Sequence, residues 1–211
     1  MGNRLVSART WLPRRWVLLT WLLVVTPHVL AQQGETERTM VNAFHQSLQD
    51  AREIGSPSQR ATALAEVIAS LYDLSAIARF SLGGQWKALS DVQRAHFTEV
   101  LADNIVATYV RRFAPADPPV ALRFAVLAVQ QARGGIVVQT ELFTATRQVR
   151  LDYFFRNGKV FNVSADGVSD LSLRRAEYTR ILQHENFAAL VAYLQTQTEE
   201  LMVTANEQTS G

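Results

Sequence analysis

The chain has 211 residues, with 21 Lys and Arg against 19 Asp and Glu, a formal net charge of +2 and no cysteine. The lack of cysteine excludes disulfides, thiol catalysis and cysteine-ligated zinc. The first 31 residues carry four arginines and no acidic residue, so the remainder has 17 basic and 19 acidic residues, a net charge of −2. A nearly neutral remainder without a basic stripe argues against nucleic acid as a partner.

Residues 1–31 have the pattern of a cleavable signal peptide. A basic segment ends at Arg14-Arg15, an apolar stretch of about ten residues follows, and small or apolar residues at 29–31 suit cleavage. This apolar run is about half as long as a membrane span requires. An uncleaved membrane anchor and a twin-arginine signal are the alternatives. Export of a cysteine-free chain favours the bacterial periplasm as its location.

The rest of the chain is predicted to form one unit. We expect a polar linker at residues 32–39, a folded domain at 40–203 and a flexible polar tail at 204–211. No repeat, low-complexity segment or internal linker divides the domain. About 180 residues suffice for one domain with a substantial core.

The first half of the domain shows the apolar periodicity of α-helices. The predicted helices span residues 40–54, 59–71, 74–82 and 91–113. Ser58 is predicted to cap the second helix and Asp73 to begin the third. Ser90 and Gln93 form a capping box for the fourth. The fourth helix carries large apolar residues at every fourth position, which predicts one buried stripe: Phe97, Leu101, Ile105, Tyr109 and Phe113.

After residue 119 the apolar period changes to two, which is typical of half-buried strands. The predicted strands span residues 120–129, 136–145, 148–156 and 159–164. Gly134-Gly135 and Asn157-Gly158 are hairpin signals, so the strands should form an antiparallel meander. Two helices follow, capped by Ser169 or Asp170 and by Asn186. This order predicts an α+β fold, with helices packed on a curved four-stranded antiparallel sheet, as in NTF2-like domains.

The sequence contains no phosphate loop, Rossmann glycine fingerprint, nucleophile-elbow serine or zincin helix. We therefore predict no catalytic residue, no metal site and no cofactor. Three aspartates at helix starts are interpreted as caps, the usual role of a carboxylate there: Asp73, Asp91 and Asp170. Three histidines lie on separate predicted helices and are interpreted as ordinary surface or partly buried residues: His45, His96 and His184. Two arginine pairs, at 111–112 and 174–175, could clamp a phosphate or carboxylate, but solvated helix faces are the favoured interpretation.

Large apolar residues are abundant for so small a sheet. They can fill a core, or they can line a cavity between the sheet and the helices that holds an apolar ligand. Both interpretations are consistent with the pattern.

Short motifs across the domain resemble those of the MlaC family, also called the toluene-tolerance auxiliary family. The matching residues are Tyr72-Asp73, Ile77-Ala78, Leu82-Gly83, Trp86, Gln93-Arg94, Phe97, Tyr109, Asn157-Gly158-Lys159, Val163, Asp166-Gly167-Val168-Ser169 and Arg174-Arg175-Ala176-Glu177-Tyr178. The double arginine resembles in particular the HpnM branch, which is associated with hopanoid biosynthesis.

The resemblance implies a periplasmic, non-enzymatic lipid carrier. Such a carrier would move phospholipid, or hopanoid in the HpnM branch, between an outer-membrane lipoprotein complex and an inner-membrane ABC transporter complex. The family's fold implies an apolar cavity between sheet and helices, with bound lipid as cargo rather than cofactor. We expect a monomer.

We place the lipid-binding wall on residues that share a predicted face. The helical wall would comprise Phe97, Leu101, Ile105 and Tyr109. The sheet wall would comprise Phe124, Val126, Val138, Leu142, Leu151 and Tyr153. Trp86 would stand at the entrance. Because the side-chain period of a strand is two, a register slip of one residue would move the whole sheet set to the other face.

Two other classes of function are consistent with the same pattern. A small enzyme on an NTF2-like fold would need a polar group inside the cavity, and the strand candidates are Glu141, Asp152 and Tyr153. A non-catalytic adaptor or chaperone of the envelope would have the same elements around a filled core. A cavity with co-purifying lipid would distinguish the carrier from both.

Overall fold

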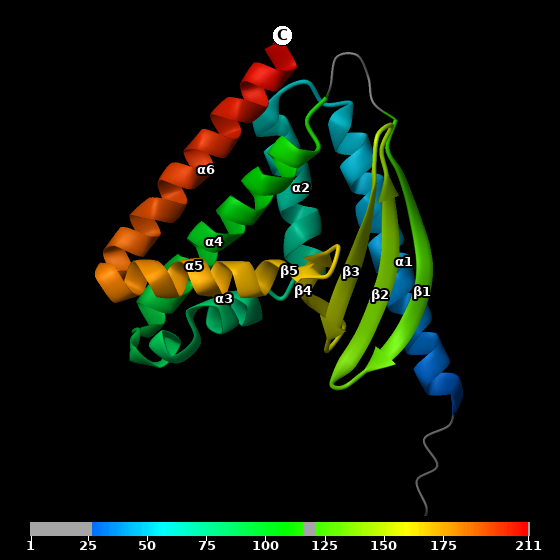
Figure 1. Cartoon of the computed structure of the whole chain (residues 1–211), viewed down its shortest axis with the longest axis horizontal. Coiled ribbons are helices and arrows are strands. Elements are labelled where there is room, and N and C mark those ends of the chain that lie inside the picture. The colour runs from blue at the N-terminus through cyan, green and yellow to red at the C-terminus, as the bar shows by residue number, and fades with distance from the viewer. Residues whose placement is uncertain (1–26, 116–120, 211) are drawn as a thin grey trace, which may run out of the picture.

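The structure is a computed structural model that describes residues 27–115 and 121–210 (Figure 1). Residues 1–26, which hold most of the predicted signal peptide, lie outside the described residues. No helix in the described ranges is long and apolar enough to cross a membrane.

In the part of the chain that the structure describes, four α-helices and a short 3-10 helix precede the sheet. They are α1 (Pro27–Arg52), α2 (Pro57–Leu71), α3 (Leu74–Leu82), η1 (Gly83–Ala88) and α4 (Asp91–Arg112). The predicted capping box of α4 is confirmed, since Ser90 accepts from the amide of Gln93 and the Gln93 side chain accepts from the amide of Ser90. Asp73 caps α3 as predicted. Ser58 does not cap α2, because Pro57 already begins that helix and Ser56 takes the N-cap position.

The sheet has five strands rather than the four predicted. They are β1 (Arg123–Ala132), β2 (Gly135–Phe143), β3 (Gln148–Arg156), β4 (Lys159–Ala165) and β5 (Val168–Ser169), antiparallel and in sequence order. Asn157 and Gly158 both have positive φ, as the predicted hairpin requires. Asp166 and Gly167 repeat that geometry, so the chain folds back and the two residues of β5 pair with the end of β4. The predicted strands end at residue 164, so β5 is the strand that the apolar period did not predict.

Two irregularities decide which strand residues face the helices. The β1–β2 register shifts between Val126 and Ala128, and the intervening Leu127 is 51% exposed. The β3–β4 register shifts between Phe154 and Phe155, opposite Phe161. A bulge of this kind adds one residue on one strand and reverses the alternation beyond it. Beyond the first bulge, Val129 rather than Ala128 therefore lies opposite buried Val138.

The remaining helices are longer than predicted. α5 spans Asp170–His184 and α6 spans Phe187–Ser210. The predicted flexible tail is instead the end of α6, where buried Ala205 accepts a hydrogen bond from the Arg60 side chain. The predicted linker at 32–39 is likewise helical, because α1 begins at Pro27.

The helices form a layer that diverges from the sheet (Figure 1). α1 lies along β1 and β2, while α4 packs against α2 and α6. α5 crosses in front of α4 and meets the sheet at β4 and β5 (Figure 1). The backbone amide of Asp73 donates to the carbonyl of Val160, which fixes the α2–α3 junction on β4. The result is the predicted α+β arrangement, with a wedge between α4 and the sheet.

Candidate lipid-binding cavity

A cavity of about 540 Å³ occupies this wedge. This volume falls within the range of small-molecule and cofactor sites. Its walls are the concave face of β2, β3 and β4, the C-terminal half of α4 and the first turns of α5. The lining residues are Leu48, Tyr72, Ile77, Ile105, Thr108, Tyr109, Arg112, Phe113, Leu122, Leu142, Thr144, Arg147, Val149, Leu151, Tyr153, Phe161, Asn162, Val163, Ala165, Val168, Asp170, Leu171, Leu173 and Arg174.

The structure brings five of the proposed wall residues together on the cavity. They are Ile105, Tyr109, Leu142, Leu151 and Tyr153. The sheet members share one face. Residues that pair across a ladder lie on the same face, and Leu142 pairs with Val149 while Thr140 pairs with Leu151. Alternate residues along β2 and β3 then place Leu142, Leu151 and Tyr153 together. The bulges fall outside these positions, so the alternation holds for β2 and β3.

The structure does not place the other proposed helical residues on the cavity. Phe97 and Leu101 are fully buried. The Phe97 ring meets the rings of Tyr178 and Phe187, at the start of α4 where α5 and α6 cover it. The apolar stripe of α4 is therefore continuous, but its first half belongs to the core between helices. Trp86 is half-buried in η1, with the Arg94 guanidinium 5.7 Å from its ring centroid, and does not line the entrance.

Three sheet residues are also absent from the cavity wall because α1 covers them. Phe124 stacks on the His45 ring of α1 at 4.0 Å between centroids. Val138 is fully buried in the core, with no solvent-accessible surface. Val126 packs against the same core, opposite buried Thr140. The position of α1 could not be derived from strand alternation, which gives the face but not what covers it.

Three tyrosines place hydroxyl groups among the apolar side chains of the cavity wall. Tyr72 and Tyr109 share a hydrogen bond of 2.5 Å between their hydroxyl oxygens. The hydroxyl of Tyr153 lies 3.0 Å from Nε2 of His45. The ring of Phe44 makes edge-on contacts with all three tyrosine rings, at centroid distances of 5.9, 5.3 and 6.3 Å. These contacts fix the rings around one apolar residue of α1.

Burial sets the protonation of this cluster. It raises the pKa of Tyr72, Tyr109 and Tyr153, so all three remain neutral phenols at physiological pH. Burial also lowers the pKa of His45 to about 4, so the imidazole is neutral. The prediction treated His45 as an ordinary residue, but it is 3% exposed and bonded to the cavity wall.

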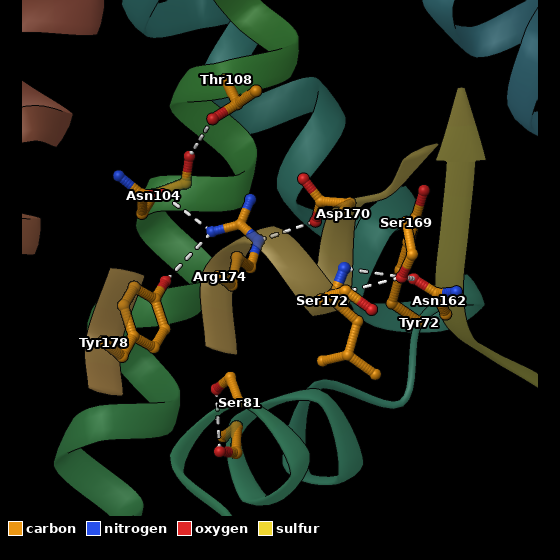
Figure 2. Close-up of polar contacts among 12 residues, drawn as sticks. Tyr72, Ser81, Asn104, Thr108, Asn162, Ser169, Asp170, Ser172, Arg174 and Tyr178 are labelled. Atoms are coloured by element: carbon orange, nitrogen blue, oxygen red, sulfur yellow. Dashed lines mark hydrogen bonds and ion pairs between the residues drawn. The ribbon is translucent and has the colours of Figure 1, made fainter. Parts of the chain in front are cut away.

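A charged network forms the α5 side of the cavity (Figure 2). Nε of Arg174 donates to Oδ2 of Asp170 at 2.7 Å, and its Nη1 donates to Oδ1 of Asn104 and to the Tyr178 hydroxyl. Burial alone would lower the pKa of Arg174, but Asp170 and Tyr178 raise it above its ordinary value. The guanidinium is therefore permanently charged although only 11% of its side chain is exposed.

Sequence reasoning missed this network. Arg174 was interpreted as part of a solvated helix face and Asp170 as a cap. The spacing of the three residues is informative, since Asp170, Arg174 and Tyr178 recur at every fourth position and therefore share one helix face. The cap itself is Ser169, whose hydroxyl accepts from the amide of Ser172.

Asn162 joins β4 to the start of α5 (Figure 2). Its Oδ1 accepts from the hydroxyl of Ser169 and from the amide of Leu171. Arg112 and Arg147, both exposed, contribute cationic side chains to the same cavity lining. The cavity thus combines apolar walls, a few internal polar groups and a cationic rim.

The strand carboxylates considered for an enzyme do not line the cavity. Asp152 lies on the opposite face of β3 and accepts from Nε of Arg150 at 3.1 Å. Glu141 lies opposite Arg150 in the β2–β3 ladder, on that same outer face. Within the described ranges, no group of three or more His, Asp or Glu residues is arranged to hold a metal ion.

Comparison with protein families matches residues 38–196 to the family described as MlaC protein. Among solved structures, the chain is similar to the phospholipid-binding protein from Ralstonia solanacearum in complex with a phospholipid. The TM-score is 0.68 and the sequence identity 17%, over 80% of this chain and 98% of that one. No curated protein matches the chain significantly. At this identity the likeness shows the fold, helices packed against an open antiparallel sheet.

Proposed function

The chain belongs to the MlaC family, and from that membership we propose that it binds a phospholipid whose acyl chains occupy the cavity. The observation that carries the proposal is the cavity itself, which has apolar walls from α4 and the concave sheet and arginines at its rim. Acyl chains match the walls. Arg112 and Arg147 match the charge of a phosphate group.

Burial of the acyl chains dominates the proposed affinity. Each methylene removed from water contributes ~0.8 kcal/mol, so roughly 30 methylenes correspond to on the order of 20 kcal/mol before the costs of binding. A neutral hydrogen bond contributes only ~1 kcal/mol net. Discrimination between headgroups should therefore be loose. Hopanoid is a second cargo that the same walls would accommodate.

We propose that the protein is a carrier rather than an enzyme. Among the described residues the cavity lining includes no strand carboxylate, and its single carboxylate, that of Asp170, is engaged by Arg174. An adaptor with a filled core does not account for an apolar cavity of about 540 Å³. In the proposed role, a monomer in the periplasm receives and delivers phospholipid at an inner-membrane ABC transporter complex and an outer-membrane lipoprotein complex. A cleaved leader would give access to that compartment.

The proposal is tested by native mass spectrometry and solvent extraction of the protein purified from the periplasm. We expect one co-purifying phospholipid or hopanoid per chain. Leu142→Asp puts a charge into the cavity wall and should abolish lipid retention in a protein with unchanged circular dichroism. Leu127→Asp, on the exposed bulge, is the matched control and should retain lipid. A protein that is empty as purified and takes up no phospholipid from vesicles would refute the proposal.

A further inference from the structure

Several hydrogen-bond donors of the cavity wall have no acceptor among the described residues, and they indicate a feature of the ligand. The inference rests on the proposed phospholipid binding and concerns the same cavity. The hydroxyls of Tyr72 and Tyr109 carry two protons, and one of these is used in the hydrogen bond between them. The second proton has no acceptor among the described residues, whichever of the two tyrosines donates.

Tyr153 provides a second proton of this kind. A neutral imidazole carries one N–H, and Nδ1 of His45 is buried with no hydrogen-bond partner in the described structure. Buried N–H groups without an acceptor are rarer than buried acceptors without a donor. The favoured tautomer therefore has its proton on Nε2, which donates to the oxygen of Tyr153. The Tyr153 proton is then free to donate into the cavity that the residue lines.

Arg174 adds a third donor on the α5 side. Its Nε and Nη1 are engaged by Asp170, Asn104 and Tyr178, while its Nη2 donates to no described residue. Figure 2 shows the guanidinium between Asn104 and Asp170, with Nη2 on the side away from Tyr178.

Two side-chain acceptors of the wall are already in use. Oδ2 of Asp170 is held by Arg174 at 2.7 Å, and Oδ1 of Asn162 accepts two hydrogen bonds from Ser169 and Leu171. An amphiphile that reaches this wall thus meets donors set among apolar side chains. An ether or hydrocarbon segment offers them at best a weak acceptor, and leaving a buried polar group unpaired is costly.

We propose that the hydroxyls of the Tyr72–Tyr109 pair and of Tyr153, with Nη2 of Arg174, bind carbonyl oxygens of the ligand, and that the protein selects acyl-ester lipids. A diacyl phospholipid has two ester carbonyls close to its chains, and the two tyrosine protons match them in number. A dialkyl ether phospholipid has the same headgroup and chain volume without the carbonyls. The free carboxylate of a fatty acid shares this acceptor chemistry and is the other source.

The test measures the affinity of the delipidated protein for three lipids, by displacement of a fluorescent phospholipid. The first two are dipalmitoyl phosphatidylcholine and its dihexadecyl ether analogue, and the third is palmitate. Two hydrogen bonds of ordinary net strength predict a roughly tenfold to thirtyfold preference for the ester over the ether. The triple variant Tyr72→Phe, Tyr109→Phe and Tyr153→Phe removes every tyrosine hydroxyl of the wall, since Tyr109→Phe alone would leave the Tyr72 proton free, and it should reduce this preference to about twofold or less while still binding both phospholipids.

The controls separate the inference from the proposed function. Tyr193→Phe removes a hydroxyl that bonds Glu177 outside the cavity, and it should leave the preference unchanged. The double variant Tyr72→Phe with Tyr109→Phe, which removes the pair as a unit and keeps the Tyr153–His45 bond, should lower the preference in part and guards against a triple variant that fails to fold. Equal affinity of the native protein for ester and ether overturns the inference but not phospholipid binding. Failure to bind either phospholipid overturns the proposed function. If palmitate binds more tightly than the ester, and if this binding depends on the tyrosines, then the donors bind a carboxylate and the ester assignment is overturned.

Discussion

His45 Nε2 lies 3.0 Å from the hydroxyl of Tyr153, and this hydrogen bond joins α1 to the middle of the sheet across 108 positions of sequence. The bond lies at the boundary between core and cavity, because Tyr153 lines the cavity whereas His45 stacks on Phe124 behind it. A neutral histidine at this place couples the stability of the fold to pH.

We predict that the protein loses stability as pH falls from about 6.5 to about 4. Burial lowers the pKa of folded His45 from 6.5 to about 4, so in this window the unfolded chain binds a proton that the folded chain does not. Stability therefore decreases with falling pH in this interval, and the full penalty of about 3 kcal/mol is present below it. Urea unfolding at pH 7 and pH 4.5 measures most of the change.

His45→Gln is the matched variant for this prediction. Glutamine keeps a polar side chain near Tyr153 but does not titrate. The variant should have lower stability than the native protein at pH 7 and a smaller loss between pH 7 and pH 4.5. Glu37 and Asp103, whose pKa values are raised by burial, contribute equally to both proteins and cancel. Identical pH dependence of the two proteins would exclude His45 as the source.

The α5 network predicts an asymmetry between its two charged partners. The Arg174 side chain is 11% exposed and the Asp170 side chain 47% exposed. Asp170→Ala leaves a buried guanidinium without its carboxylate and should cost about 2 kcal/mol. Arg174→Met keeps the volume and leaves a carboxylate that water can solvate, so it should cost about 1 kcal/mol. Urea unfolding at pH 7 measures both.

Asp91→Ala is the control for this comparison. Like Asp170, Asp91 lies in the first turn of a helix and pairs with an arginine, Arg94, but its side chain is 97% exposed. Both substitutions remove a favourable charge at a helix N-terminus. The excess cost of Asp170→Ala therefore reports the buried guanidinium, and equal costs for the two aspartates would contradict the assignment.

Much of this arrangement could be predicted from sequence because local signals determine it. The capping box at Ser90 and the hairpin at Asn157-Gly158 depend on residues within four positions of each other. The shared face of Leu142, Leu151 and Tyr153 follows from the period of two. These signals are sufficient for the α+β class, and five of the eleven proposed wall residues border the cavity.

The remaining features depend on contacts between distant segments. The stripe of α4 is uniform in sequence, and only the crossing of α5 and α6 makes Phe97 core while Ile105 lines the cavity. The cover of α1 removes Val138 from the wall in the same way. The helical continuation to Ser210 is stabilised by burial of Ala205 and its contact with Arg60, 145 positions away. Periodicity gives a face, but not which part of the face is covered.

The start of β2 should be intolerant of any side chain. A Cβ added at Gly135 would lie 1.8 Å from the carbonyl oxygen of Phe155 on the neighbouring strand. Because backbone cannot move aside as a flexible side chain can, Gly135→Ala should cost about 3 kcal/mol in unfolding free energy. Gly55→Ala is the control, since a Cβ there meets nothing within 4 Å and its φ is not positive. Equal melting temperatures for the two variants would contradict this close approach.

The division of the apolar stripe between core and cavity is testable with a pair of truncations. Phe97 has no exposed surface and packs against Tyr178 and Phe187, so Phe97→Ala should cost about 4 kcal/mol in unfolding free energy. Leu151 borders the cavity and is half-buried, so Leu151→Ala removes fewer contacts and should cost about 1 kcal/mol. Urea unfolding of the delipidated proteins measures this difference.

Lipid binding should respond in the opposite order. Leu151→Ala removes a surface that the proposed acyl chains contact, so the affinity for phospholipid should fall by about fifteenfold to sixtyfold, as expected for the loss of two or three buried methylene contacts. Phe97→Ala, in whatever fraction remains folded, should bind phospholipid with nearly native affinity because no wall residue is altered. Both are measured by displacement of a fluorescent phospholipid at 10 °C. A loss of affinity in Phe97→Ala with none in Leu151→Ala would place the ligand between the helices rather than against the sheet.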